Sequence, residues 1–198
     1  MPKGSQFERD FCKDLSLWWT AQETDEMFWR SSNSGGRATV RARAGKTTSG
    51  QHGDIAAIHP EGMKLIDIIT FELKRGYSKD TIHNVFDAPE SSAVQVWESW
   101  YQQATESAHN ANSETWMIVH KRDRRDVMIY FPQRFYDLLK RNTCFQNADP
   151  YHGKYLPFVR FQTSIRMKNQ TSLVDNIVMM RWSDFKVAVS PNVLRKLF

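Results

Sequence analysis

The stretch GDIAAIHPEGMKLIDIITFELKRG, residues 53–76, decides the fold expected of this chain. It holds two apolar runs rich in isoleucine around a Pro/Gly-containing turn at residues 59–62, and the second run ends in Glu72 and Lys74. Such a pattern is typical of a β-hairpin. Because side chains alternate between faces along a strand, Glu72 and Lys74 share one face. We predict that the hairpin places Asp54 opposite Glu72, so that two carboxylates and one ammonium group converge.

The predicted cluster of Asp54, Glu72 and Lys74 has a specific chemical use. Neighbouring carboxylates repel unless a cation neutralises them, and hard oxygen ligands suit Mg²⁺ or Mn²⁺. An ion held there can polarise a phosphodiester, activate water and stabilise a leaving oxygen. The lysine can orient or deprotonate the attacking water, or neutralise charge on the phosphate. The alternative is an ordinary surface strand that ends in a Glu/Lys pair. Asp67 falls on the other face and ranks below Asp54 as a ligand.

The order of these residues resembles the D-(x)n-(D/E)-x-K signature of the PD-(D/E)xK nuclease superfamily. The N-terminal half is most similar to the archaeal-type Holliday junction resolvases, which begin with a Gly-x-x-x-E-R-like helix. Here that motif is GSQFER, residues 4–9, and a Ser/Gly/Arg-rich connection follows it. The residue before Asp54 is Gly53, whereas the signature has proline.

This resemblance implies an α/β fold of restriction-endonuclease type: a mixed central sheet flanked by helices, with an extra α+β C-terminal portion. It implies catalytic roles for Glu8, Asp54, Glu72 and Lys74. Asp54, Glu72 and the backbone carbonyl of Leu73 would hold Mg²⁺ or Mn²⁺.

The expected activity is that of a Mg²⁺-dependent endodeoxyribonuclease that acts on branched or duplex DNA as a homodimer, since a four-way junction presents two symmetric strands. Three alternatives remain open. One is a restriction-type or phage recombination nuclease, another is an RNA-processing nuclease, and the third is a nucleic-acid-binding protein without catalysis.

Composition is compatible with this expectation. The 198 residues suit one domain, with a nuclease core at about 1–131 and an extension at about 132–198. A net charge of +5 hints at a polyanionic partner. The two cysteines, Cys12 and Cys144, have no metal-type spacing and indicate reduced thiols. No apolar leader, membrane-spanning run or Gly-rich nucleotide loop is present in the sequence, so we expect a cytoplasmic protein without a membrane or nucleotide cofactor.

Residues 5–20 are predicted to form a helix, because Phe7, Phe11, Leu15 and Trp18 recur on one helical face. Glu8 has two candidate roles. Together with Ser5 it matches a capping box, and it can also face the active site from the first turn.

The segment from residue 27 to residue 53 contains no acidic residue and is rich in Ser, Gly and Thr. We expect a short strand near residues 27–30 at its start. The rest of the segment is expected to contact phosphate, although a plain exposed loop is the alternative. The candidate contacts are Ser34, Arg37, Arg41, Arg43 and Lys46.

The remaining elements are predicted from periodicity. A helix over residues 91–109 is expected to carry Gln95 or Gln102 near the site, and it would connect to a parallel strand at 115–120. A second hairpin joins the runs 116–119 and 127–131, with a charged tip that is either solvated or in contact with DNA. The other predicted elements are a helix at 134–141, strands at 156–163 and 176–182, and a C-terminal helix after Ser190.

Overall fold

The computed structural model describes residues 3–31, 53–77, 79–89, 92–141, 158–167 and 171–198. Residues 32–52 of the segment predicted to contact phosphate lie outside these ranges, and with them Ser34, Arg37, Arg41, Arg43 and Lys46. Cys144 also lies outside them. Cys12 is a buried free thiol whose pKa is raised to about 12, chiefly by burial, so it is unreactive at neutral pH.

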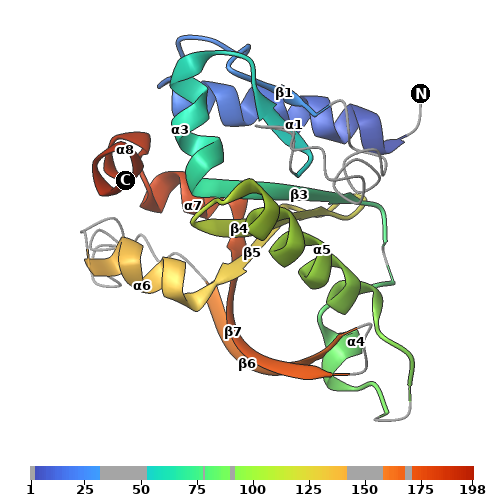
Figure 1. The fold of residues 1–198 in the computed structure, drawn as a ribbon. Coiled ribbons are helices and arrows are strands. Elements are labelled where there is room, and N and C mark those ends of the chain that lie inside the picture. The colour runs from blue at the N-terminus through green and yellow to red at the C-terminus, as the bar shows by residue number, and fades with distance from the viewer. Residues whose placement is uncertain (1–2, 32–52, 78, 90–91, 142–157, 168–170) are drawn as a thin grey trace, which may run out of the picture.

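Helices and strands follow one another along the chain as Figure 1 shows. In order they are α1 (Lys3–Trp19), β1 (Phe28–Arg30), β2 (Ile55–Ala57), α3 (Pro60–Ile68), β3 (Ile69–Arg75), α4 (His83–Phe86), α5 (Val96–Ala111), β4 (Thr115–Lys121), β5 (Val127–Pro132), α6 (Gln133–Arg141), β6 (Phe158–Arg166), β7 (Ser172–Arg181), α7 (Trp182–Ala188) and α8 (Pro191–Leu197).

The centre is a five-stranded mixed sheet in the order β3-β4-β5-β7-β6. β3 and β4 run parallel, with α5 in the connection between them, and the other neighbours run antiparallel. β1 and β2 form a separate antiparallel pair. The predicted mixed sheet flanked by helices is thereby confirmed, as are the parallel strand after α5 and the hairpin of β4 and β5. β6 and β7, from the predicted C-terminal portion, extend this same sheet.

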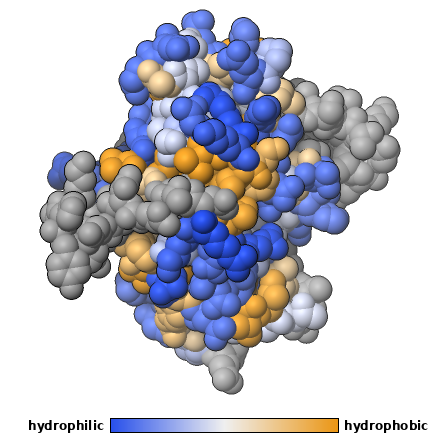
Figure 2. Space-filling model, turned by 90° about the vertical axis from the view of Figure 1, so that its left-hand side faces the viewer, coloured by the Kyte–Doolittle hydropathy of each residue, from blue (hydrophilic) through white to orange (hydrophobic). Residues whose placement is uncertain are grey.

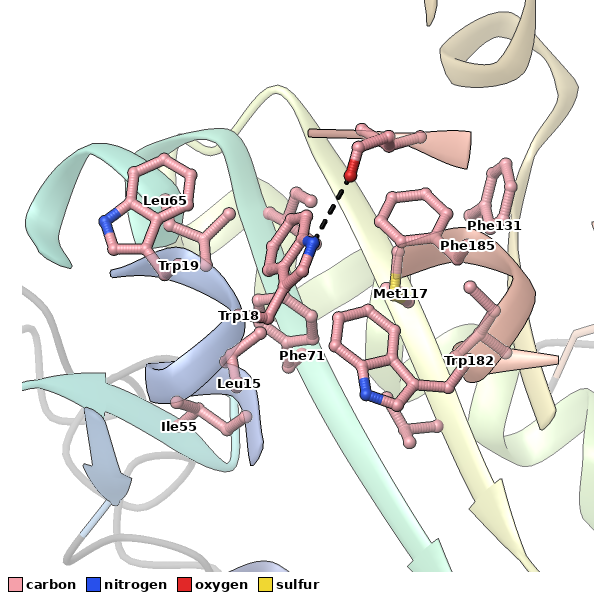
Figure 3. Close-up of a cluster of buried hydrophobic side chains, with 14 of the residues drawn as sticks. Leu15, Trp18, Trp19, Ile55, Leu65, Phe71, Met117, Phe131, Trp182 and Phe185 are labelled. Carbon is pink, nitrogen blue, oxygen red and sulfur yellow. Dashed lines mark hydrogen bonds between the residues drawn. The ribbon is translucent and has the colours of Figure 1, made fainter. Parts of the chain in front are cut away.

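Each face of the sheet has its own apolar core, because side chains alternate along every strand. On β4, Met117 and Val119 join the core under α1, α3 and the C-terminal helices, while Trp116 and Ile118 join the core under α5. Figure 3 shows the first core, in which the indole nitrogen of Trp18 donates to the carbonyl of Val189 at 3.3 Å. The C-terminal end of α1 therefore packs against the connection between α7 and α8 on this face of the sheet.

The predicted hairpin at residues 53–76 is wrong in its middle. Pro60 is in the first turn of α3, and Leu65, Ile66 and Ile68 are buried on that helix. Apolar side chains at this spacing fit a helix as well as a strand, and Pro at a helix start is favoured over Pro in a strand. Gly62 packs so closely that a Cβ would lie 2.9 Å from the ring of Phe28. It therefore allows α3 to approach β1, and it is not part of a turn.

The α1 helix buries the predicted face of Phe7, Phe11, Leu15 and Trp18. The capping-box prediction is wrong, however, because α1 begins at Lys3 and Ser5 already lies inside it. The helix α1 thus begins two residues before Ser5, the predicted N-cap.

The side of the molecule at the left in Figure 1 carries α3, α6 and α8, and Figure 2 shows that its surface is mainly hydrophilic with hydrophobic residues gathered in the middle. Phe198 lines two pockets there, one with Ile68 and the other with Phe135 and Leu138. Within the described ranges, no helix combines the length and the apolar character that crossing a membrane requires.

Candidate active site

β3 divides the two cores, and its sequence ITFELKR alternates accordingly. Phe71 and Leu73 enter the core under α1. Glu72 and Lys74 point toward α5 on the other face, where they retain only 1% and 8% of their exposure. Charged groups are rarely buried to this extent without partners. The partners of this pair therefore define the site.

Asp54 reaches β3 through backbone bonding and not through a hairpin. Its N–H donates to the carbonyl of Phe71 at 2.8 Å, and its carboxylate Oδ2 accepts the N–H of Leu73 at 2.7 Å. Ser31 holds the segment from the other side, donating its N–H to the Asp54 carbonyl at 2.9 Å. The predicted meeting of Asp54 with the Glu72–Lys74 strand is thus observed, by a route that the hairpin prediction did not contain.

Gly53 makes this approach possible. It adopts a φ of +79°, and a Cβ on it would lie 2.7 Å from the carbonyl oxygen of Phe71. Only glycine fits both restrictions at low energetic cost. The residue before Asp54 therefore sets where its carboxylate lies.

Two side chains of α5 hold the acid and the amine of β3. Lys74 donates from Nζ to Glu72 Oε2 at 3.1 Å and to Gln103 Oε1 at 2.7 Å. Ser107 donates from its hydroxyl to Glu72 Oε1 at 2.8 Å. Gln103 and Ser107 are four residues apart, so they share one face of the helix.

Glu8 lies close to the same place. Its carboxylate pairs with Arg30 Nε at 3.0 Å, and Asp54 is close enough to raise its pKa. A pocket of about 230 Å³ opens here, and its lining residues are Gly4, Phe7, Glu8, Asp54, Leu73, Lys74, Arg75 and Tyr77. The structure therefore brings Glu8, Asp54 and Lys74 together around one cavity, with Glu72 bound to Lys74.

Burial makes all three carboxylates of the site harder to ionise than exposed ones. Burial first and the charge of Asp54 second raise the pKa of Glu72 to about 7, against the opposing effects of Lys74 and Ser107. Burial also raises the pKa of Asp54 and of Glu8, against the charge of Lys74 and of Arg30 respectively. Three acids near one cavity with raised pKa values are typical of functional sites.

The chemistry of these donors fits a hard divalent cation. Backbone groups two residues apart on a strand point to the same edge, so the Leu73 carbonyl lies on the edge where Phe71 accepts from Asp54. Each carboxylate oxygen offers more than one acceptor site, so the bonds to Asp54 and Glu72 leave room for a further partner. In the described part of the chain, no three His, Cys, Asp or Glu side chains are placed so that together they could hold a metal ion. The fit therefore rests on two carboxylates and a carbonyl.

Comparison with known proteins adds an independent observation. A family model described as "Phage putative PDDEXK endonuclease" matches residues 2–156. The chain belongs to this family. A search of curated proteins and a search of solved structures returned no match.

The name PDDEXK contains the same acid, acid and lysine pattern that Asp54, Glu72 and Lys74 form, and all three lie inside the matched range. In that name P precedes the first acid, whereas Gly53 precedes Asp54 in this chain. Proline fixes φ near about −65° and cannot adopt the +79° seen here, which gives a structural reason for this departure. Membership in an endonuclease family indicates a nuclease.

The glutamine that bonds to Lys74 is Gln103 and neither Gln95 nor Gln102, the two predicted to lie near the site; a DNA contact by Gln95 stays a prediction. The side chain of Gln95 bonds to the carbonyl of Ala93 at the start of α5, and Gln102 donates to the carbonyl of Arg166. Gln95 precedes Gln103 by about 12 Å of helix. Gln103 and Ser107 were missed, although their spacing of four on the helix after the E-x-K strand was a usable signal.

Proposed function

We propose that this PDDEXK protein is a divalent-metal-dependent DNA endonuclease of restriction-endonuclease-like fold. The observation that supports this most is that the half-buried carboxylate of Asp54 meets the buried Glu72 and Lys74 of edge strand β3 beside a polar pocket. Removing charged groups from water is costly, so such a cluster indicates a function more than a contribution to stability.

Asp54, Glu72 and the Leu73 carbonyl would hold the cation. Mg²⁺ or Mn²⁺ bound there would supply polarisation of the phosphodiester, a more acidic water and stabilisation of the leaving oxygen. Lys74, held in place by Gln103, orients the attacking water or balances charge on the phosphate. Glu8 borders the same pocket and is the fourth catalytic candidate.

DNA is the proposed substrate, and the net charge of +5 favours binding of a polyanion. The preference for branched DNA and the homodimer remain proposals that rest on the resemblance of the N-terminal half to junction resolvases. The Gly-x-x-x-Glu motif at residues 4–8 supports this resemblance, because Gly4 and Glu8 both line the pocket.

A cleavage panel tests the function. Four-way junction, flap, linear duplex, single-stranded DNA and RNA are incubated with Mg²⁺ and with wild type, Glu72→Ala or Lys74→Ala. Wild type should cut DNA, and both variants should lose at least about 100-fold in rate while still binding it. Asp67→Ala is the matched control, since Asp67 is an exposed carboxylate on α3.

Wild-type protein that binds DNA and cuts none of its forms would instead support a binding protein without catalysis. Cutting of RNA alone would support an RNA-processing nuclease. A strictly monomeric species in light scattering would count against junction resolution but not against nuclease action.

A further inference from the structure

Tyr77 is an exposed aromatic residue at the edge of the candidate active site. It follows Lys74 by three residues and lines the same pocket as Glu8, Asp54 and Lys74. Tyr77 is 48% exposed, although most of the preceding strand β3 is buried. Four of the other seven lining residues are charged, and the two apolar ones, Phe7 and Leu73, are buried, so Tyr77 is the accessible ring of this pocket.

The backbone places this ring at a conformational cost. Gly76 has a φ of +91° and Tyr77 itself has a φ of +49°. A bulky residue rarely adopts a positive φ, and such outliers cluster at functional sites. Two bonds of 3.1 Å hold the turn, from Gly76 N–H to the Lys121 carbonyl and from Asp80 N–H to the Tyr77 carbonyl.

Two buried rings lie behind Tyr77, one in contact with it and the next in contact with the first. Tyr77 contacts Trp100 in a T-shaped arrangement at 5.1 Å between ring centroids, and Trp100 contacts His120 in the same way at 4.8 Å. Trp100 is 5% exposed and His120 is 2% exposed, so the support is part of the core. Trp100 lies on the face of α5 that also carries Gln103 and Ser107, which links this support to the residues that hold Lys74 and Glu72.

We infer that Tyr77 is a stacking platform for an unpaired nucleobase next to the scissile phosphate. The inference rests on the proposed nuclease function and narrows its substrate to DNA in which a strand leaves the duplex. A base inside a duplex already has neighbours on both faces, so only a base that is unpaired or splayed out can stack on a protein ring. A phosphate in the pocket brings the base of an adjacent nucleotide within reach of Tyr77.

Fluorescence of 2-aminopurine tests the inference in full-length protein. The base analogue is placed unpaired beside the cleavage position of a flap, or paired at the same place in a duplex, and binding is followed in EDTA so that no metal-dependent cutting interferes. Wild type and Tyr77→Phe should quench the unpaired analogue, whereas Tyr77→Leu should lose the quench and bind the flap about tenfold more weakly.

Phe86→Leu is the matched control. Phe86 is also an exposed ring, at 54%, and it also rests edge-on against another ring, that of Phe161, but it does not line the pocket. The control should behave like wild type. A quench that persists in Tyr77→Leu, or no quench in wild type, would overturn the inference.

The inference and the nuclease proposal can fail separately, because quenching is measured without cleavage. A Tyr77-dependent quench in a protein that never cuts DNA would overturn the nuclease function and leave the platform intact. Cleavage with equal preference for flap and duplex in wild type and Tyr77→Leu would overturn the platform alone.

Discussion

Glu72 holds its proton to a higher pH than an exposed glutamate does, because it is buried beside Asp54. Its ordinary pKa is 4.5, and in the folded protein it rises to about 7. Between these values the native state binds more protons than the unfolded state, so the free energy of unfolding should fall as pH rises through this window.

Urea denaturation of the metal-free protein at pH 5 and pH 8 measures this effect. Wild type should lose about 1–3 kcal/mol more stability between the two pH values than Glu72→Gln, which has no such proton. Equal losses in the two proteins would mean that Glu72 titrates normally, contrary to its placement.

Gln103 and Gln102 are adjacent in sequence and should differ in effect. Gln103 is exposed and accepts a hydrogen bond from Lys74, while Gln102 is buried and donates to Arg166. Gln103→Leu should lower kcat by about tenfold, the scale of one charge-assisted hydrogen bond, with Tm changed by less than about 2 °C.

Gln102→Leu should instead lower Tm, since it removes the donor to the part-buried carbonyl of Arg166, while it spares kcat at a temperature where the protein is folded. Cleavage kinetics and thermal denaturation of both variants check the contrast. A Gln103→Leu enzyme with wild-type kcat would remove this residue from the site.

At the scale of elements, the turn before β2 decides where Asp54 lies. Gly53 and Gly76 both have positive φ, but only at Gly53 would a Cβ clash with another strand, and Gly76 has open space around it. Gly76→Ala should cost about 1 kcal/mol through φ alone.

Gly53→Ala should cost at least about 2 kcal/mol more, because β3 must move away from the new methyl group. Urea denaturation gives both values, and cleavage assays should show the larger loss for Gly53→Ala. Similar stabilities for the two variants would contradict the close approach of Gly53 to Phe71.

The start of α5 is tied to β6 by an ion pair. Glu98 is fully buried, and its oxygens accept from Arg166 Nε at 3.1 Å and from the Arg166 backbone at 2.8 Å. The side chain of Arg166 is 23% exposed and stays partly hydrated without Glu98, so Glu98→Ala should lower the free energy of unfolding by about 1.5–3 kcal/mol. Equilibrium unfolding checks this, and a loss below about 1 kcal/mol would show that the pair is dispensable.

The elements that sequence alone predicted are those with one dominant signal. β3, β4 and β5 have clear apolar patterns, and α1 repeats its aromatic residues at helical spacing. The helix α3 was missed because the apolar residues Leu65, Ile66 and Ile68 also suit a strand, and the preference of Pro60 for a helix start was not used.

Sequence alone predicted part of the candidate active site, namely the residues whose position follows from strand alternation. The E-x-K alternation placed Glu72 and Lys74 on one face, but Asp54 arrives through a glycine turn that no hairpin rule describes. Gln103 could not be chosen over its neighbours, because the sequence does not show which face of α5 lies against β3. The roles of the basic residues between 32 and 52 stay predictions.

At the scale of the whole molecule, the end of the chain belongs to the same sheet as the site. β7 pairs with β5, and Trp182 and Phe185 pack beside Phe11 and Phe131 in the core under α1. A chain that stops at residue 156 would leave these faces exposed. We expect it to show no cooperative unfolding transition in circular dichroism, whereas full-length protein should show one. Cooperative folding of the shortened chain would make the C-terminal part a true appendage.

The proposed metal site of Asp54 and Glu72 is tested most directly by a calorimetric titration of Mn²⁺ into full-length protein. Wild type should bind at least one ion, and Asp54→Asn and Glu72→Gln should each weaken that binding by at least about tenfold, while Asp67→Asn leaves it unchanged. Wild-type affinity in both Asp54→Asn and Glu72→Gln would contradict the proposal that these carboxylates hold one cation together.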